Sequence, residues 1–209
     1  MDRMYRHQRH IYDVTRKFYL LGRDEMIADL APPAGAHILE IGCGTGRNLM
    51  MLAERYPDAQ IFGLDASEAM LETARRRIAR AGLGTRIRLA RGLGETLDAR
   101  ALFDEEQGFD AIVISYVLTM VPAWPQIVER AAASLAPCGR LGIVDFWDQR
   151  DLPLWFRRLL RGWLDLFGVR PASDMPRRIE GALRRQGGML SCQSIFGGYA
   201  FRMSYKAPG

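Results

Sequence analysis

The chain has 209 residues, of which 48% are hydrophobic, so it can fold as one domain with a sizeable core. No apolar run reaches the roughly 18 residues of a membrane-spanning helix, and the arginine-rich N-terminal stretch is not typical of a secretory signal. The net charge of +5 favours an anionic partner, which would be a nucleic acid, an anionic membrane surface or an acidic substrate; the alternative is a surface of solvated arginines.

Residues 5–23 predict a helix on which tyrosine and arginine alternate along one face. At about 100° per residue, spacings of four and three keep these side chains within an arc of roughly 80°. The alternating residues are Tyr5, Arg9, Tyr12, Arg16, Tyr19 and Arg23. Because aromatic rings attract an ammonium group and guanidinium groups bind carboxylates or phosphates, we expect a lid that contacts substrate and cofactor. The alternative is an exposed amphipathic helix whose tyrosines fill gaps.

A glycine-rich loop follows the first apolar run, residues 38–41, which predicts a buried parallel strand. Gly42, Gly44 and Gly46 let the backbone turn sharply and approach a ligand closely, and residues 48–55 predict a helix behind them. A dinucleotide fingerprint is not matched, because its third glycine would fall on Arg47 or Leu49. A phosphate-binding loop is not matched either, because no lysine is nearby.

The second apolar run, residues 61–64, ends in Asp65, and an acid at the tip of a second strand is placed to accept hydrogen bonds from ribose hydroxyls. With Asp65, the pattern Glu-x-Gly-x-Gly-x-Gly from Glu40 to Gly46 resembles motif I of the class I S-adenosylmethionine (SAM) methyltransferases. The resemblance implies SAM as cofactor and S-adenosylhomocysteine as product, with Glu40 facing the cationic end of SAM. The expected cofactor-binding residues are Tyr19, Arg23, Glu40, Gly42, Cys43, Gly44, Gly46, Asp65, Ala66, Met70, Gly94, Glu95, Ser115 and Tyr116.

The next elements are a helix over residues 68–81 and a third strand over 86–90. The resemblance implies that Met70, on the inner side of this helix, packs on adenine. After the third strand, relatives often carry an aspartate that reaches the adenine amine, whereas this chain has Leu93. Backbone groups or Glu95 are therefore expected to bind the adenine edge.

The fourth strand, residues 109–114, runs into the stretch from Ser115 to Met120, which includes Tyr116 and Thr119. Ligands of open α/β sheets lie beyond the carboxyl ends of the strands, so these residues should border the transferred methyl group. The Asp/Asn/Ser-Pro-Pro-aromatic motif of nucleobase amino-methyltransferases is absent here, which counts against an adenine of DNA or RNA as the substrate. A helix over residues 125–135 and a fifth strand over 140–145, ending in Asp145, complete this part.

An insertion, residues 148–188, follows the fifth strand. Its stretch 152–167 is apolar, aromatic and basic together, which suits either an interfacial helix or a wall of the substrate pocket. Pro171, Pro176 and a turn rich in arginine come next, the arginines being Arg177, Arg178, Arg184 and Arg185. Residues 189–196 and 199–206 flank Gly197-Gly198 and predict a hairpin.

The order of elements resembles the class I methyltransferase fold over nearly the whole chain. We therefore expect an α/β, Rossmann-like fold with a seven-stranded, mostly parallel sheet and an antiparallel last strand. Residues 1–209 would form a single domain, with an N-terminal helical lid at 1–30, a SAM-binding core at 31–147, the helical insertion at 148–188 and the terminal hairpin at 189–209.

More narrowly, residues 5–24, the insertion and the closing stretch from Gly197 to Phe201 resemble the bacterial N-methyltransferases of betaine-lipid synthesis. That resemblance implies three successive methylations of diacylglycerylhomoserine to diacylglyceryl-N,N,N-trimethylhomoserine. The alternatives are a phosphatidylethanolamine N-methyltransferase, a quinone C-methyltransferase, and a SAM-binding peripheral-membrane module without turnover.

An amine must lose a proton before it attacks a methyl group, because only the neutral form has a lone pair. The candidates for orienting the amine or relaying its proton are Tyr5, His7, Tyr116 and Asp145, and the expected substrate-binding residues are Tyr5, Tyr12, Arg16 and Thr119. The arginine-flanked insertion would dock transiently on the anionic inner face of a membrane. Three widely spaced cysteines in no metal-ligand pattern favour a reducing compartment, the cytoplasm, and no metal site.

Overall fold

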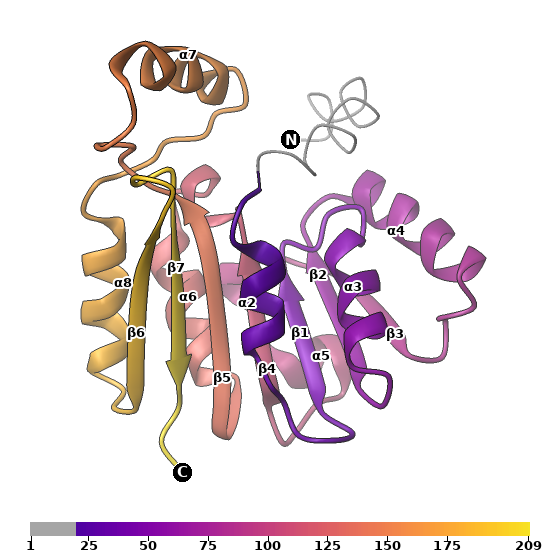
Figure 1. The fold of residues 1–209 in the computed structure, drawn as a ribbon. Coiled ribbons are helices and arrows are strands. Elements are labelled where there is room, and N and C mark those ends of the chain that lie inside the picture. The colour runs from indigo at the N-terminus through magenta and orange to yellow at the C-terminus, as the bar shows by residue number, and fades with distance from the viewer. Residues whose placement is uncertain (1–19) are drawn as a thin grey trace.

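The computed structural model describes residues 20–209. The expectations on Tyr5, His7, Tyr12, Arg16 and Tyr19 lie outside the described residues. The described chain forms a seven-stranded sheet in the order β3-β2-β1-β4-β5-β7-β6 (Figure 1). Its strands are β1 (His37–Ile41), β2 (Gln60–Asp65), β3 (Ile87–Arg91), β4 (Phe109–Ser115), β5 (Leu135–Phe146), β6 (Met189–Ile195) and β7 (Ala200–Lys206).

The first five strands pair in parallel, and β7 lies antiparallel between β5 and β6. The predicted fold class is therefore confirmed, and so is the terminal hairpin, in which Ile195 pairs with Ala200 across the turn that holds Gly197 and Gly198. In the described sheet, β7 alone runs against its neighbours.

Helices cover both faces of the sheet. They are α2 (Arg23–Asp29), α3 (Arg47–Arg55), α4 (Glu68–Arg80), α5 (Ala99–Phe103), α6 (Trp124–Ala133), α7 (Leu154–Asp165) and α8 (Met175–Arg184), with short 3-10 helices η1 (Gly94–Thr96) and η2 (Leu118–Met120). Neighbouring residues of β4 belong to different cores: Val113 packs with α2, α3 and α4, whereas Ile112 packs with α5, α6 and α8. Burial on both faces explains why the inner strands are continuous apolar runs.

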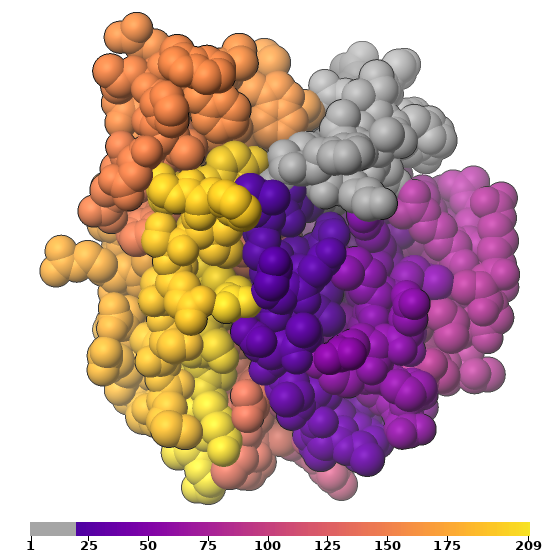
Figure 2. All heavy atoms as spheres, viewed as in Figure 1, coloured from indigo at the N-terminus to yellow at the C-terminus, as the bar shows by residue number. Residues whose placement is uncertain are grey.

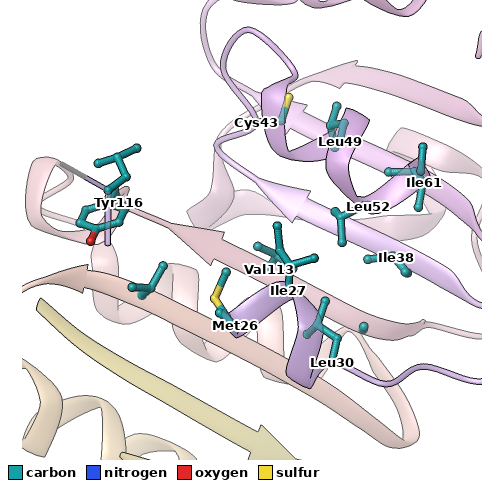
Figure 3. Close-up of a cluster of buried hydrophobic side chains, with 14 of the residues drawn as sticks. Met26, Ile27, Leu30, Ile38, Cys43, Leu49, Leu52, Ile61, Val113 and Tyr116 are labelled. Atoms are coloured by element: carbon teal, nitrogen blue, oxygen red, sulfur yellow. The ribbon is translucent and has the colours of Figure 1, made fainter. Parts of the chain in front are cut away.

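Helix α2 is a layer of the fold that the sequence analysis did not separate from the lid. Its Met26, Ile27 and Leu30 lie with Val113 in the core on that face (Figure 3). Gly142 of β5 permits the close approach, because a Cβ atom added there would lie 3.0 Å from Met26 Cγ. The described end of the predicted lid is thus packed on the sheet.

The turn predicted around Arg177 and Arg178 is wrong, because these residues belong to helix α8. Pro176 stands in the first turn of α8, where a missing N–H leaves no hydrogen bond unmade. Ile179 and Leu183 are fully buried and four residues apart, so one helical face packs on the sheet while the arginines face outward.

Helix α7 stands beyond the carboxyl ends of the parallel strands, where Figures 1 and 2 show it in orange as a projection above the hairpin. Arg161 Nη2 donates to the carbonyl oxygen of Asp148 at 3.2 Å, which ties α7 to the segment after β5. Of the helices in the described range 20–209, none is long and apolar enough to cross a membrane.

Candidate functional site

The loop after β1 has a shape that only glycine permits. Gly42, Gly44 and Gly46 have φ angles of 76°, 54° and 78°, in the left-handed region that side chains disfavour. A Cβ atom added to Gly42 would lie 2.4 Å from Val117 Cγ2. The amides of Gly42 and Cys43 both donate to the Leu64 carbonyl, at 2.7 and 3.0 Å. The loop is therefore held against the end of β2.

Asp65 braces this loop from the tip of β2. One carboxylate oxygen accepts the Gly44 N–H at 2.7 Å and the other accepts the Ser67 N–H at 2.8 Å. Backbone donors on both oxygens fix the orientation of the carboxylate before any ligand arrives, which is the preorganisation that a ribose-binding acid needs.

A cavity of about 180 Å³ opens beside Asp65 at the carboxyl ends of β1, β2 and β4. Eight of the residues expected to bind the cofactor line it: Gly42, Gly44, Asp65, Ala66, Met70, Gly94, Glu95 and Tyr116. Val117 and Met120, from the stretch expected to border the methyl group, also line it, and so does Leu93. The remaining lining residues had not been expected there: they are Ile41, Leu64, Ser67, Gly92, Val121 and Ile127. Ile127 of α6 packs on Gly94 of η1, a contact between distant segments for which the sequence holds no local signal.

A second, polar hollow lies on the other side of Gly42, which borders both spaces. Its charged and polar lining comes from Arg23, Glu40, Arg47, Asn48 and Ser115, together with Leu20, Cys43 and Thr45. Asn48 Nδ2 donates to Glu40 Oε1 at 2.6 Å. Arg23 is 3% exposed although its partner Asp24 lies at the surface. A group with both an ammonium and a carboxylate suits such a mixture of charges.

The Ser115 hydroxyl borders this hollow. Its oxygen is buried and has no hydrogen-bond partner in the part of the chain that the structure describes. Buried hydroxyls are normally paired, so this one lies ready for a polar group in the hollow.

Cys43 lies in the glycine-rich loop and is 5% exposed. Burial raises the pKa of its thiol well above the usual value, and the nearby carboxylates of Glu40 and Asp65 raise it further. The thiol is therefore neutral, and Cys43 serves as a small apolar neighbour rather than as a nucleophile.

Asp145, at the end of β5, holds helix η2 in place. Its carboxylate accepts the Leu118 and Thr119 N–H groups, at 2.7 and 3.2 Å, the Thr119 hydroxyl at 2.6 Å and the Phe146 N–H at 2.8 Å. Burial raises its pKa to about 6, against the lowering effect of these hydrogen bonds. Both oxygens of the Asp145 carboxylate and the Thr119 hydroxyl are engaged in these hydrogen bonds, so the geometry gives the two residues a positioning function beneath the site.

Tyr116 is the predicted catalytic candidate that does reach the cavity. Its backbone has φ of 56°, unusual for a bulky residue. Its hydroxyl donates to the Leu21 carbonyl at 2.7 Å, and its ring lies 4.7 Å from that of Phe146. Burial raises the pKa of the phenol well above its usual value, so Tyr116 stays neutral and does not act as a base.

Comparison with known proteins matches part of this chain to a family. Residues 38–139, from β1 into β5, match the family described as a methyltransferase domain. Residues 38–139 form a class I SAM-dependent methyltransferase domain. SAM is the cofactor that this family and fold imply. Gly42 would then lie at the junction of its two ends, Asp65 and Met70 on the nucleoside, and Glu40 and Ser115 on the amino-acid part.

Relatives of this methyltransferase domain act on different compounds. Trans-aconitate 2-methyltransferase of Variovorax paradoxus is 34% identical over 66% of this chain and 48% of its own length. Demethylmenaquinone methyltransferase of Listeria monocytogenes is 28% identical over 74% of this chain and 64% of its own length. A SAM-dependent methyltransferase structure from Aquifex aeolicus has a TM-score of 0.68 at 16% identity, covering 95% of this chain and 96% of the other. The chain spans about half the length of the trans-aconitate enzyme, and the structural likeness shows the fold alone.

Proposed function

We propose that this chain transfers the methyl group of SAM to the amine of a lipid head group. The acceptor would be diacylglycerylhomoserine, converted by three successive methylations to its trimethylated betaine. The observation that carries the lipid acceptor is the surface of α7. It combines exposed apolar side chains with arginines. Helix α7 stands beyond the carboxyl ends of the parallel strands (Figure 1), where the residues that line the cofactor cavity also lie.

Helix α7 is apolar on two sides. Leu160 and Leu164 are buried and hold it to the body of the protein. Trp155, Leu159 and Leu166 are 70%, 67% and 73% exposed, and their spacing of four and seven keeps them within an arc of about 40°. Side chains of this size gain roughly 1.5–3 kcal/mol each on leaving water, which an interfacial position would supply.

Positive charge accompanies the exposed stripe. Arg157, Arg158 and Arg161 come from α7 itself, whereas Arg150, on the segment that leads into it, is paired with Asp148 at 3.0 Å. Each basic residue near an anionic bilayer contributes about 1 kcal/mol to association. The α7 surface therefore supports transient docking on the anionic inner face of a membrane, which we propose as the place of action.

The reaction joins the amine nitrogen to the methyl carbon as the carbon–sulfur bond breaks, and the amine proton passes to water. Bound SAM supplies a methyl group on a positively charged sulfur. The protein supplies position, because an in-line displacement gains most from alignment of the reacting atoms. The Tyr116 O–H forms a hydrogen bond to the Leu21 carbonyl. The phenol oxygen is therefore left to accept a hydrogen bond from an N–H of the amine and to orient it.

The test is to incubate the purified chain with isotopically labelled SAM and liposomes that contain diacylglycerylhomoserine or phosphatidylethanolamine, and to identify products by mass. Mono-, di- and trimethylated homoserine lipid is the expected result. Methylated ethanolamine lipid alone would move the acceptor to the phospholipid. SAM binding without any methylated lipid would contradict the proposal and favour a binding module.

A second candidate is methylation of a quinone ring carbon. The likeness to the Listeria demethylmenaquinone enzyme, over 74% of this chain, favours it. Quinones also lie in membranes, so the α7 surface would serve both acceptors. Adding demethylmenaquinone to the same liposomes separates the two candidates, because only one lipid class would take up the labelled methyl group.

A further inference from the structure

The side-chain amide of Gln149 is buried without a partner. The residue is 0% exposed, and neither Nε2 nor Oε1 has a hydrogen-bond partner in the described chain. Leaving a buried amide unpaired costs free energy that an apolar side chain of the same size would not cost. Packing alone therefore does not account for a glutamine at this position.

The backbone of Gln149 is fixed in an unusual conformation. Its φ angle is 58°, in the left-handed region that residues other than glycine rarely adopt. Its N–H donates to the Gly198 carbonyl at 2.8 Å, and its carbonyl accepts the Leu152 N–H at 3.2 Å. Gln149 is thus held between the β6–β7 turn and the start of α7. Strained residues held this firmly are frequent at ligand sites.

Gln149 also lies just beyond the carboxyl end of β5, outside the two cavities that border Gly42. It follows the last residue of β5, Phe146, by three positions, and the ring of Phe146 contacts those of Tyr116 and Tyr199 at 4.7 and 5.7 Å. The Tyr116 N–H donates to the Val144 carbonyl at 2.8 Å, so β4 and β5 end side by side. In open α/β sheets, ligands bind beyond the carboxyl ends of the strands.

We propose that Gln149 recognises the head group of the acceptor, with Nε2 donating to its carboxylate and Oε1 accepting from the amine beside it. This inference rests on the proposed lipid amine acceptor. An amide presents a donor and an acceptor next to each other, and an amine next to a carboxylate presents the complementary pair. A neutral amide suits the site better than arginine, because a buried charge left without its acceptor costs far more than a buried amide.

The two hydrogen bonds have different fates during three methylations. The neutral amine that attacks has two N–H groups in the first round, one in the second and none in the third. The bond to Oε1 is therefore available only in the first two rounds, whereas the bond from Nε2 to the carboxylate persists in all three. Loss of the amide should slow the first round more than the third.

The experiment compares the wild-type chain with Gln149→Leu and Gln149→Met, using vesicles that carry the unmethylated, monomethylated or dimethylated homoserine lipid. We expect SAM affinity to stay within about twofold and the melting temperature to be unchanged or raised, because an unpaired amide is removed. The KM for the unmethylated lipid should rise at least about tenfold, and that for the dimethylated lipid by less.

Equal KM values for wild type and both variants on all three lipids would overturn the inference while leaving the proposed function intact. An equal loss in all three rounds would overturn the bond to the amine. If the wild-type chain itself methylates none of these lipids, the proposed function fails and the inference fails with it. Gln149→Met keeps the length of the side chain, so the comparison stands if the leucine variant does not fold.

Discussion

The cofactor side of the site, which is the cavity beside Asp65 and the hollow beside Glu40, differs from the acceptor side, which is the segment after β5 together with α7. The difference lies in how their polar side chains are paired. Beside the cofactor cavity, Asp65 holds two backbone amides and Glu40 holds Asn48, so the charged groups are oriented in advance. Beyond β5, Gln149 is buried without a partner and Trp155 stands in water. In the first half the carboxylates are oriented before a ligand arrives and the Ser115 hydroxyl is left unpaired for it, whereas in the second half both polar atoms of the Gln149 amide are unpaired in the described chain and Trp155 is exposed.

The largest effect should come from breaking the preorganised side. Asp65→Ala removes the proposed ribose contacts and leaves the Gly44 and Ser67 amides without their acceptor. Loss of several charge-assisted hydrogen bonds should weaken SAM binding about 1,000-fold, measured by calorimetry. Asp58→Ala, at an exposed aspartate before β2, is the control and should bind normally. Unchanged binding by the Asp65 variant would remove Asp65 from the site.

The buried carboxylate of Asp145 should make the free energy of unfolding depend on pH. Because the pKa of Asp145 is raised from 3.8 to about 6 in the folded chain, its contribution to stability is fully present below about pH 4 and is lost as pH rises through 6. The difference of about two pKa units corresponds to about 3 kcal/mol. Urea unfolding from pH 4 to pH 7 should show this fall in the wild type and not in Asp145→Asn. Parallel pH profiles would contradict it.

On the acceptor side, Trp155→Ala combined with Leu159→Ala should reduce binding to anionic vesicles at least about tenfold, because both side chains leave water only at the membrane. Sedimentation with the vesicles measures this, and melting temperature should not fall. Met189→Ala is the matched control, since Met189 is 68% exposed at the opposite end of the sheet. Equal vesicle binding by all three proteins would count against docking through α7.

The smallest expected effect is a gain in SAM affinity from a substitution in the cofactor cavity. Leu93 is 49% exposed and lines the cofactor cavity where relatives often carry an aspartate. Leu93→Asp adds one acceptor for the adenine amine and should tighten SAM binding about threefold, the net value of one hydrogen bond. Leu154→Asp introduces the same charge on α7 and should leave SAM affinity unchanged. Weaker binding by the Leu93 variant would mean that apolar contact matters more there.

The cofactor side could be predicted from sequence because its signals are local. Glu40, the alternating glycines and Asp65 lie within two strands and the loop between them, and each has one physical reason for its place. SAM as the cofactor and the sheet were confirmed on that basis. The membership of Ile127 in the same wall depends on α6 crossing to η1, which no local pattern encodes.

The acceptor side was harder to predict because its signals conflict. Pro176 and the arginines around it indicated a turn, although a proline in the first turn of a helix costs nothing and the buried face of α8 needed only Ile179 and Leu183. Gln149 gave no signal at all, since a polar residue in a loop is ordinary until its burial is known. For residues 152–167 the sequence left two alternatives, an interfacial helix and a wall of the substrate pocket. In the structure α7 has both a buried and an exposed apolar side.

The neutral thiol of Cys43 has a consequence for the enzyme under oxidative stress. Peroxides and alkylating reagents attack thiolates that they can reach, and Cys43 is neither ionised nor accessible. The exposed thiols, Cys138 and Cys192, lie on β5 and β6, away from the glycine-rich loop. Oxidants can therefore modify the exposed thiols of this protein and still leave the glycine-rich cofactor loop chemically intact.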